Sequence, residues 1–159
     1  IDGNVVLGAL PLRILTTSLI ENENIGGVVT LNENYETKFL MFSSEEWKSL
    51  GISHLHLPTP DFNNVPDPAM LKEGVKFIKQ FDNLDSSCYV HCKAGRGRSA
   101  TLVACYLIET YQLTSTEAIE ILKSKREQTL LSSKQLIAID KFYQEMQMSR
   151  KSKAELLDA

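Results

Sequence analysis

The chain has 159 residues, of which 43% are hydrophobic, and a formal net charge of −3 at pH 7. This length suits a single domain with one core, and no apolar run is long enough to span a membrane. The acidic balance argues against a general nucleic-acid-binding protein, which usually carries a basic excess.

The first half of the chain predicts three strands with helical segments between them. Residues 4–8 form a short apolar run, and Pro11 can begin a helical turn after it. The β-branched run at 28–31 predicts a central strand. Residues 44–50 predict a short helix capped by a serine, with Trp47 facing inward. Polar and apolar residues alternate over 53–57, which predicts a third strand.

From residue 67 onward, helices dominate. Asp67 before Pro68 is a cap residue followed by proline, so we expect a helix that runs to about Gln80. Residues 88–91 predict a buried strand, and a largely buried helix should begin near Arg98. These elements bracket a short loop that contains two glycines.

Two further helices carry capping-box patterns at their starts. Thr114 is followed three residues later by a glutamate, and Ser132 by a glutamine. The apolar face of the last helix is expected to comprise Leu136, Ile137, Ile139 and Phe142.

Strands separated by helices predict a single-domain α/β fold whose central, twisted and mostly parallel sheet is flanked by helices. Active sites in such sheets lie at the carboxyl ends of the strands, where the loop after residue 91 falls. We expect a catalytic domain over 1–148. Residues 149–159 are polar and predict a tail, interpreted as a frayed helix end.

The loop between the strand at 88–91 and the next helix has the features of an anion site. Successive backbone N–H groups converge in such a loop, and the positive end of the helix dipole lies beneath them. Cys92 stands at its mouth, where a thiol has its pKa lowered and is partly thiolate. The loop therefore offers a nucleophile and a phosphate site together.

These residue types are those that phosphate-ester cleavage through a covalent intermediate needs. Cys92 is the candidate nucleophile, and the guanidinium of Arg98 can clamp two phosphate oxygens. Ser99 is expected to donate a hydrogen bond to the sulfur, and His91 to fix the loop through its ring nitrogens. Gly95 and Gly97 are expected to allow tight curvature with positive φ. The phosphate-binding backbone comprises Lys93, Ala94, Gly95, Arg96, Gly97 and Arg98.

The leaving alcohol needs a proton, and Asp61 is the best candidate general acid. It comes after the strand at 53–57 in a proline-containing loop, 31 residues before Cys92 (92 − 61 = 31), which leaves room for a helix and a strand between them. A lone loop aspartate is usually a turn residue or a helix cap. Asp67 is the rival acid, but its place before proline makes it a cap first.

The other cysteines and the histidines favour structural roles. Cys88 and Cys105 stand in apolar runs and predict buried core thiols in a reducing compartment. A protective disulfide between Cys88 and oxidised Cys92 is an alternative that would need backbone movement. His54 and His56 share a strand face, but no carboxylate comes after them at a ligand spacing. We expect no metal and no cofactor.

The motif His91-Cys92, five residues, Arg98-Ser99 resembles the active-site motif of cysteine-dependent protein tyrosine and dual-specificity phosphatases. The resemblance covers nearly the whole chain, including the upstream acid loop, and implies a protein tyrosine phosphatase-like fold. Residues 7–13, 32–37 and 92–101 are similar to the branch of that family that dephosphorylates phosphatidylglycerophosphate on the route to cardiolipin.

That resemblance implies a phosphorylated lipid substrate, an anionic membrane surface as partner and a mitochondrial, inner-membrane-associated location. It places Tyr35 and Glu36 in a loop that helps to position the headgroup, with Asn34 departing from the branch pattern. Lys93 and Arg96 either attract the phosphate and the membrane or are solvated charges. We expect a monomer without a nucleic-acid partner. A dual-specificity phosphoprotein phosphatase and a binding module without turnover are the alternatives.

Overall fold

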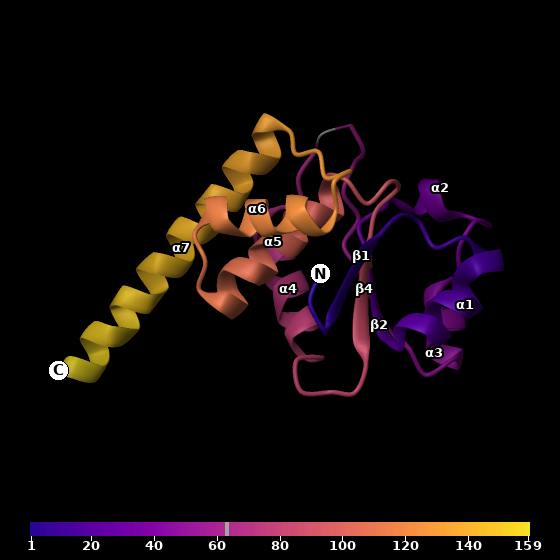
Figure 1. The fold of residues 1–159 in the computed structure, drawn as a ribbon, viewed down its shortest axis with the longest axis horizontal. Helices are drawn as coiled ribbons and strands as arrows, with labels where there is room; N and C mark the ends of the chain where they lie inside the picture. Colours follow the sequence, from indigo (N-terminus) through magenta and orange to yellow (C-terminus); the bar gives the residue numbers. More distant parts are fainter. Residues whose placement is uncertain (63) are drawn as a thin grey trace.

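The computed structural model describes residues 1–62 and 64–159, which form three layers (Figure 1). A four-stranded sheet in the order β1-β4-β2-β3, with every neighbouring pair parallel, lies between α1 and α3 on one side and α4 to α7 on the other. The elements are β1 (Val5–Gly8), α1 (Arg13–Glu23), β2 (Ile25–Thr30), α2 (Asn34–Thr37), α3 (Ser44–Ser49), β3 (Ser53–His56), α4 (Pro68–Lys79), β4 (Ser87–His91), α5 (Arg98–Tyr111), α6 (Ser115–Lys125) and α7 (Ser133–Asp158). This confirms the predicted fold class.

Each face of the sheet has its own apolar core because successive side chains of a strand point to opposite faces. Val28 and Tyr89 belong to a small cluster with Trp47 of α3. Val29 and Val90, the next residues along β2 and β4, belong to the larger cluster with α4 to α7. The two inner strands are therefore covered on both faces, which explains their apolar runs.

Several helix starts lie where the sequence predicts them. Ser43 caps α3 by accepting a hydrogen bond from the Glu46 N–H, and Trp47 is fully buried. The Asp67 carboxylate accepts from the Met70 N–H at 2.9 Å, which caps α4. Thr114 and Ser132 cap α6 and α7 through complete capping boxes.

The structure also corrects part of the expected core. In α7, Ile139 and Phe142 are buried, but Leu136 and Ile137 are 40% and 56% exposed. Only the stripe that faces α5 is covered, so the predicted apolar face was too wide. The one-turn helix α2 has no predicted counterpart.

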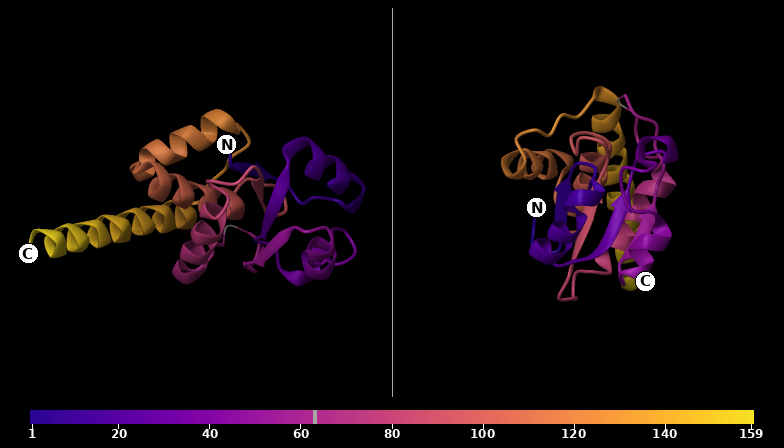
Figure 2. Two further views of the ribbon diagram at one scale, coloured as in Figure 1. Left: turned by 90° about the horizontal axis from the view of Figure 1, so that it is seen from below. Right: turned by 90° about the vertical axis from the view of Figure 1, so that its right-hand side faces the viewer.

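The last helix extends beyond the body of the fold, as Figure 2 shows. α7 continues without a break to Asp158, and residues 151–158 are exposed. The division between a domain at 1–148 and a tail stays a prediction. Among residues 1–62 and 64–159, no helix combines the length and apolarity that crossing a bilayer requires.

Candidate active site

The loop between β4 and α5 turns its carbonyl groups outward. The Lys93 carbonyl accepts from the Leu10 N–H at 3.1 Å, and the Arg96 carbonyl from the Leu130 N–H at 2.9 Å. Arg126 donates to two more, through Nε to Gly95 O at 2.9 Å and through Nη2 to Ala94 O at 3.2 Å. In a trans peptide the C=O and N–H point in opposite directions. The loop N–H groups are thereby directed inward, as an anion site requires.

The two loop glycines serve different purposes. Gly95 has φ +66°, and a Cβ there would lie 2.3 Å from the Gly8 carbonyl oxygen, so both conformation and space require glycine. Gly97 has φ −125°, which lies outside the left-handed region. The prediction of a positive φ at Gly97 was therefore wrong. A Cβ there would lie 2.9 Å from Gln135 Nε2, so the Gln135 side chain would have to move to make room for it.

Cys92 lies at the base of the loop and is only 3% exposed. Its Sγ lies 3.1 Å from the Ser99 hydroxyl. Burial alone would raise the pKa of this thiol, but hydrogen bonds from Ser99 and Gly95 and the charge of Arg98 outweigh it and lower the pKa below the ordinary value. The sequence-based expectation of a stabilised thiolate agrees with this geometry.

Arg98, the first residue of α5, is 3% exposed, and its guanidinium faces oxygen atoms of three residues. Its Nη1 and Nη2 donate to the two Glu36 carboxylate oxygens at 2.8 Å each, and Nη1 also donates to Thr59 O at 2.8 Å. Asp61 Oδ1 lies 3.2 Å from Nη2. The Nε–H donates to no atom of residues 1–62 or 64–159. A phosphate on the Nε–Nη2 edge would therefore use this N–H and compete with Asp61 for Nη2.

Glu36 holds Arg98 instead of facing the thiol. Burial opposes ionisation of its carboxyl group, but hydrogen bonds from Arg98, the Glu33 N–H and Asn32, together with the charge of Arg98, outweigh burial and lower its pKa to about 2. Both carboxylate oxygens are used by Arg98, and Asn32 Nδ2 donates to one of them at 3.2 Å. The assignment of Glu36 to direct substrate binding stays a prediction.

A pocket of about 250 Å³ joins the candidate acid and the candidate nucleophile. Asp61 and Cys92 both line it, with Phe62 and Leu130 at the rim. The exposed side chains of Lys93 and Arg96 lie beside them, and the pocket lining comprises Asp61, Phe62, Cys92, Lys93, Ala94, Arg96, Gly97, Arg98, Leu130 and Gln135. Asp67, the rival acid, is occupied as the α4 cap.

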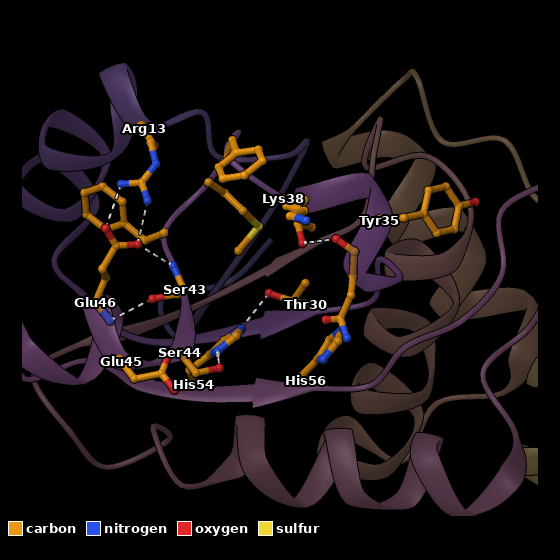
Figure 3. Close-up of a pocket in the computed structure, with 15 residues that line it drawn as sticks. Arg13, Thr30, Tyr35, Lys38, Ser43, Ser44, Glu45, Glu46, His54 and His56 are labelled. Carbon is orange, nitrogen blue, oxygen red and sulfur yellow. Dashed lines mark hydrogen bonds and ion pairs between the residues drawn. The ribbon is translucent and has the colours of Figure 1, made fainter.

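Tyr35 lies apart from this pocket. It is 70% exposed and lines a second, larger cavity of about 910 Å³ between α1, α2, α3 and β3. Figure 3 shows its ring pointing away from the other residues that line this cavity. The structure thus does not bring Tyr35 to the thiol, and its role in headgroup binding stays a prediction.

His91 is fully buried beneath the loop, where desolvation lowers its pKa to about 3. Its Nδ1 lies 3.2 Å from the Cys92 carbonyl oxygen, and its Nε2 lies 2.8 Å from Thr30 Oγ1. Because the ring is neutral and a carbonyl only accepts, Nδ1 carries the proton. These contacts are those expected of a residue that fixes the loop, and this role of His91 stays a prediction.

The other cysteines are free thiols buried in the larger core. Within the described part of the chain, no three His, Cys, Asp or Glu side chains lie close enough to hold a metal ion. Sequence reasoning missed three contributors: Arg126, which turns two loop carbonyls; Thr30, which bonds His91; and the Thr59 carbonyl on Arg98. No local motif signals any of them, since each lies at least 30 residues away in sequence from its partner.

Comparison with known proteins agrees with this geometry. Residues 14–145 match the family described as "Dual specificity phosphatase, catalytic domain". The chain is 46% identical over 146 residues to "Phosphatidylglycerophosphatase and protein-tyrosine phosphatase 1" of Rattus norvegicus, covering 92% of this chain and 76% of the relative. It is 38% identical over 142 residues to "Phosphatidylglycerophosphate phosphatase PTPMT2" of Arabidopsis thaliana, covering 89% and 60%. It superposes on the "Crystal Structure of PTPMT1 in complex with PI(5)P" with a TM-score of 0.90 at 43% identity, covering 94% and 96%.

Proposed function

The chain belongs to the dual specificity phosphatase family, and on that basis we propose that it hydrolyses the phosphomonoester of phosphatidylglycerophosphate through a phosphocysteine intermediate on Cys92. The observation that carries the proposal is one buried site that combines a stabilised thiolate, a guanidinium and a carboxyl group. Cys92, Arg98 and Asp61 all line the same pocket of about 250 Å³.

In the first step the Cys92 thiolate attacks phosphorus, the bond from phosphorus to the ester oxygen breaks, and Asp61 gives its proton to the departing alcohol. Arg98 and the inward N–H groups of the loop hold the three equatorial oxygens as charge spreads over them. In the free site, Asp61 pairs with Arg98 Nη2. A bound phosphate would take that donor, and Asp61, released from Arg98 and protonated from solvent, would then face the ester oxygen.

In the second step water attacks the phosphocysteine, Asp61 takes a proton from the water, and the thiolate of Cys92 leaves. The Ser99 hydroxyl, 3.1 Å from Sγ, stabilises the departing sulfur. Inorganic phosphate is the product, and the enzyme returns to its starting state. No step requires a metal or a cofactor.

The lipid part of the proposal is supported by the rim of the pocket and by the relatives. Phe62 and Leu130 are 87% and 66% exposed, and Lys93 and Arg96 stand with them at the mouth. Phe62 also has φ +62°, an unfavourable conformation for a bulky residue that burial does not offset. Apolar and basic side chains around one opening suit a phosphate presented by an anionic lipid surface.

The names of the relatives extend the proposal. The rat and Arabidopsis proteins are named as phosphatidylglycerophosphate phosphatases, and the PTPMT1 crystal structure is titled as a complex with PI(5)P. We propose that this chain acts as a monomer at an anionic membrane surface in the mitochondrion. The name of the rat protein also includes protein-tyrosine phosphatase, which keeps phosphoprotein substrates as the second candidate.

The substrate is tested by comparing kcat/KM for phosphatidylglycerophosphate in mixed micelles with kcat/KM for phosphotyrosine and phosphothreonine peptides. We expect a preference for the lipid of about 100-fold or more, as specificity set by pocket contacts allows. A preference for peptides would reject the lipid and favour the phosphoprotein role. Binding of all substrates without turnover would favour the binding module.

A further inference from the structure

An unbroken series of hydrogen bonds links the 910 Å³ cavity to the backbone of the candidate nucleophile. Figure 3 shows its outer half, with Ser44, His54 and Thr30 in line. Ser44 Oγ lies 2.8 Å from His54 Nδ1, and His54 Nε2 lies 2.8 Å from Thr30 Oγ1. Thr30 Oγ1 lies 2.8 Å from His91 Nε2, and His91 Nδ1 lies 3.2 Å from Cys92 O.

Both imidazoles in this series are neutral. Desolvation, aided by the neighbouring His56, lowers the pKa of His54 to about 4, and burial lowers that of His91 to about 3. A neutral imidazole has one N–H donor and one nitrogen acceptor. Each ring therefore receives a hydrogen bond on one side and donates one on the other.

The acceptor at the inner end then sets the direction of every bond. The Cys92 carbonyl only accepts, so His91 donates through Nδ1–H and accepts at Nε2. The Thr30 hydroxyl must donate to that nitrogen, so it accepts from His54 Nε2–H. His54 Nδ1 is left as an acceptor, and the Ser44 hydroxyl donates to it. Only this arrangement satisfies all four bonds.

We propose that His54 is a positioning residue for Cys92 that acts through Thr30 and His91; the inference rests on the proposed role of Cys92 as nucleophile. By donating to Thr30, His54 directs the threonine hydroxyl toward His91 and keeps the proton of His91 on Nδ1. That proton holds the Cys92 carbonyl. The N–H of Lys93 belongs to the same peptide unit and points the opposite way, into the anion site. Hydrogen bonds in series also strengthen one another.

His56 shows that the arrangement is particular to one histidine. Its ring stacks near that of His54, with centroids 6.3 Å apart, and it lies on the same face of β3. Its Nε2, however, donates to the Asn32 carbonyl at 2.7 Å, and His56 takes no part in the series that reaches Cys92. A place on this face of β3 therefore does not by itself link a histidine to Cys92.

The test uses variants that interrupt or restore the series of hydrogen bonds, and one control variant outside it. His54→Leu removes the donor to Thr30, and Thr30→Val removes the hydroxyl while keeping the shape. His54→Gln keeps an N–H donor and a carbonyl acceptor. Glu45→Gln is the matched control, because Glu45 lines the same cavity and lies outside the series.

Two readouts separate positioning from mere loss of structure. The first is kcat/KM for p-nitrophenyl phosphate, which needs the site chemistry but no lipid. The second is the pH dependence of Cys92 alkylation by iodoacetate, followed by mass spectrometry of its peptide, which needs no turnover. We expect about a tenfold fall in kcat/KM for Thr30→Val and about a fivefold fall for His54→Leu. The alkylation profile moves to higher pH in both variants.

His54→Gln should recover most of the activity, and adding His54→Leu to Thr30→Val should cost little more, because both interrupt one series. Unchanged alkylation and kinetics in Thr30→Val and His54→Leu would overturn the proposal, as would an equal loss in Glu45→Gln. If the wild-type protein does not cleave p-nitrophenyl phosphate, the proposed function fails, while the alkylation profiles still decide the role of His54.

Discussion

Cys88 lies near the start of β4 and Cys92 directly follows its last residue, and the two are almost equally buried, at 0% and 3% exposed. Burial raises the pKa of Cys88, whereas the pKa of Cys92 is lowered despite its burial. Both residues belong to the larger apolar cluster, but Cys92 also faces the Ser99 hydroxyl and the charge of Arg98. Burial alone therefore gives an inert thiol, and burial among donors gives a stabilised thiolate.

The two thiols also differ in the course of the chain beyond them. After Cys88 the strand continues and its backbone groups pair with β1 and β2. After Cys92 the chain leaves the sheet, and its carbonyl groups bond to donors outside the loop, including Arg126. A reactive thiol thus needs a place just beyond the end of a strand. The N–H groups there are not used by the sheet and can point toward one anion.

The largest expected effect is the loss of the nucleophile. Cys92→Ser should lower kcat by about 10⁴-fold or more, because a serine hydroxyl is not ionised there. Inorganic phosphate should still bind to this variant in calorimetry, since the loop N–H groups remain. Cys88→Ala is the matched variant and should keep its activity while unfolding more easily. Residual turnover of Cys92→Ser near the wild-type level would remove Cys92 from the role.

The next largest effect is expected from loss of the candidate general acid, Asp61. Asp61→Asn should lower kcat by about 100-fold for alkyl phosphates, which have poor leaving groups, as expected for loss of a general acid. Aryl phosphates with good leaving groups should be affected far less. Steady-state kinetics on both ester classes provide the measurement. Equal losses for the two classes would contradict the assignment of Asp61.

A smaller effect should appear when the donor that distinguishes Cys92 is removed. Ser99→Ala deletes the hydroxyl 3.1 Å from Sγ, so the pKa of Cys92 should rise toward that of an ordinary thiol. The acid limb of kcat/KM then moves to higher pH, and breakdown of the phosphocysteine slows by about tenfold. Pre-steady-state kinetics should show a larger burst. A pH profile that matches the wild type would show that Ser99 does not stabilise the thiolate.

The smallest effect on turnover is expected at Glu36, and it is most visible in stability. The pKa of Glu36 is lowered to about 2, so its carboxylate stabilises the fold above the ordinary glutamate pKa, and this contribution is lost as pH falls toward 2. Glu36→Gln should lower stability at pH 7 by about 2 kcal/mol once solvent screening of the pair is allowed for. Denaturant titrations of the two proteins should converge near pH 2, and a constant difference across this range would contradict the pairing with Arg98.

Much of the fold follows from local signals in the sequence. Proline after Asp67 and the capping boxes at Thr114 and Ser132 lie at the true helix starts. By contrast, α1 has no such cap: Leu12, at its N-cap, makes no side-chain cap bond, and Ile14 is 87% exposed. The position of α1 depends on its packing against β2, which no short window of sequence describes.

The candidate site likewise has features that follow from one short segment of sequence and others that depend on distant segments. The segment from His91 to Ser99 supplies the thiol, the glycine turn and the guanidinium within nine consecutive residues, so their proximity follows from the sequence. The pairing of Glu36 with Arg98 spans 62 residues and exists because the loop after β2 meets the start of α5. The exposed Phe62 in a left-handed conformation likewise carries no signal in composition or spacing.

The most direct test of the account is to trap the intermediate. The wild-type protein and Ser99→Ala are mixed with a labelled aryl phosphate, quenched in acid within milliseconds and digested for mass spectrometry. We expect the phosphoryl group on the peptide that contains Cys92, with more of it in Ser99→Ala and none in Cys92→Ser. Phosphate on another residue, or turnover with no phosphoenzyme in either active protein, would contradict the proposed mechanism.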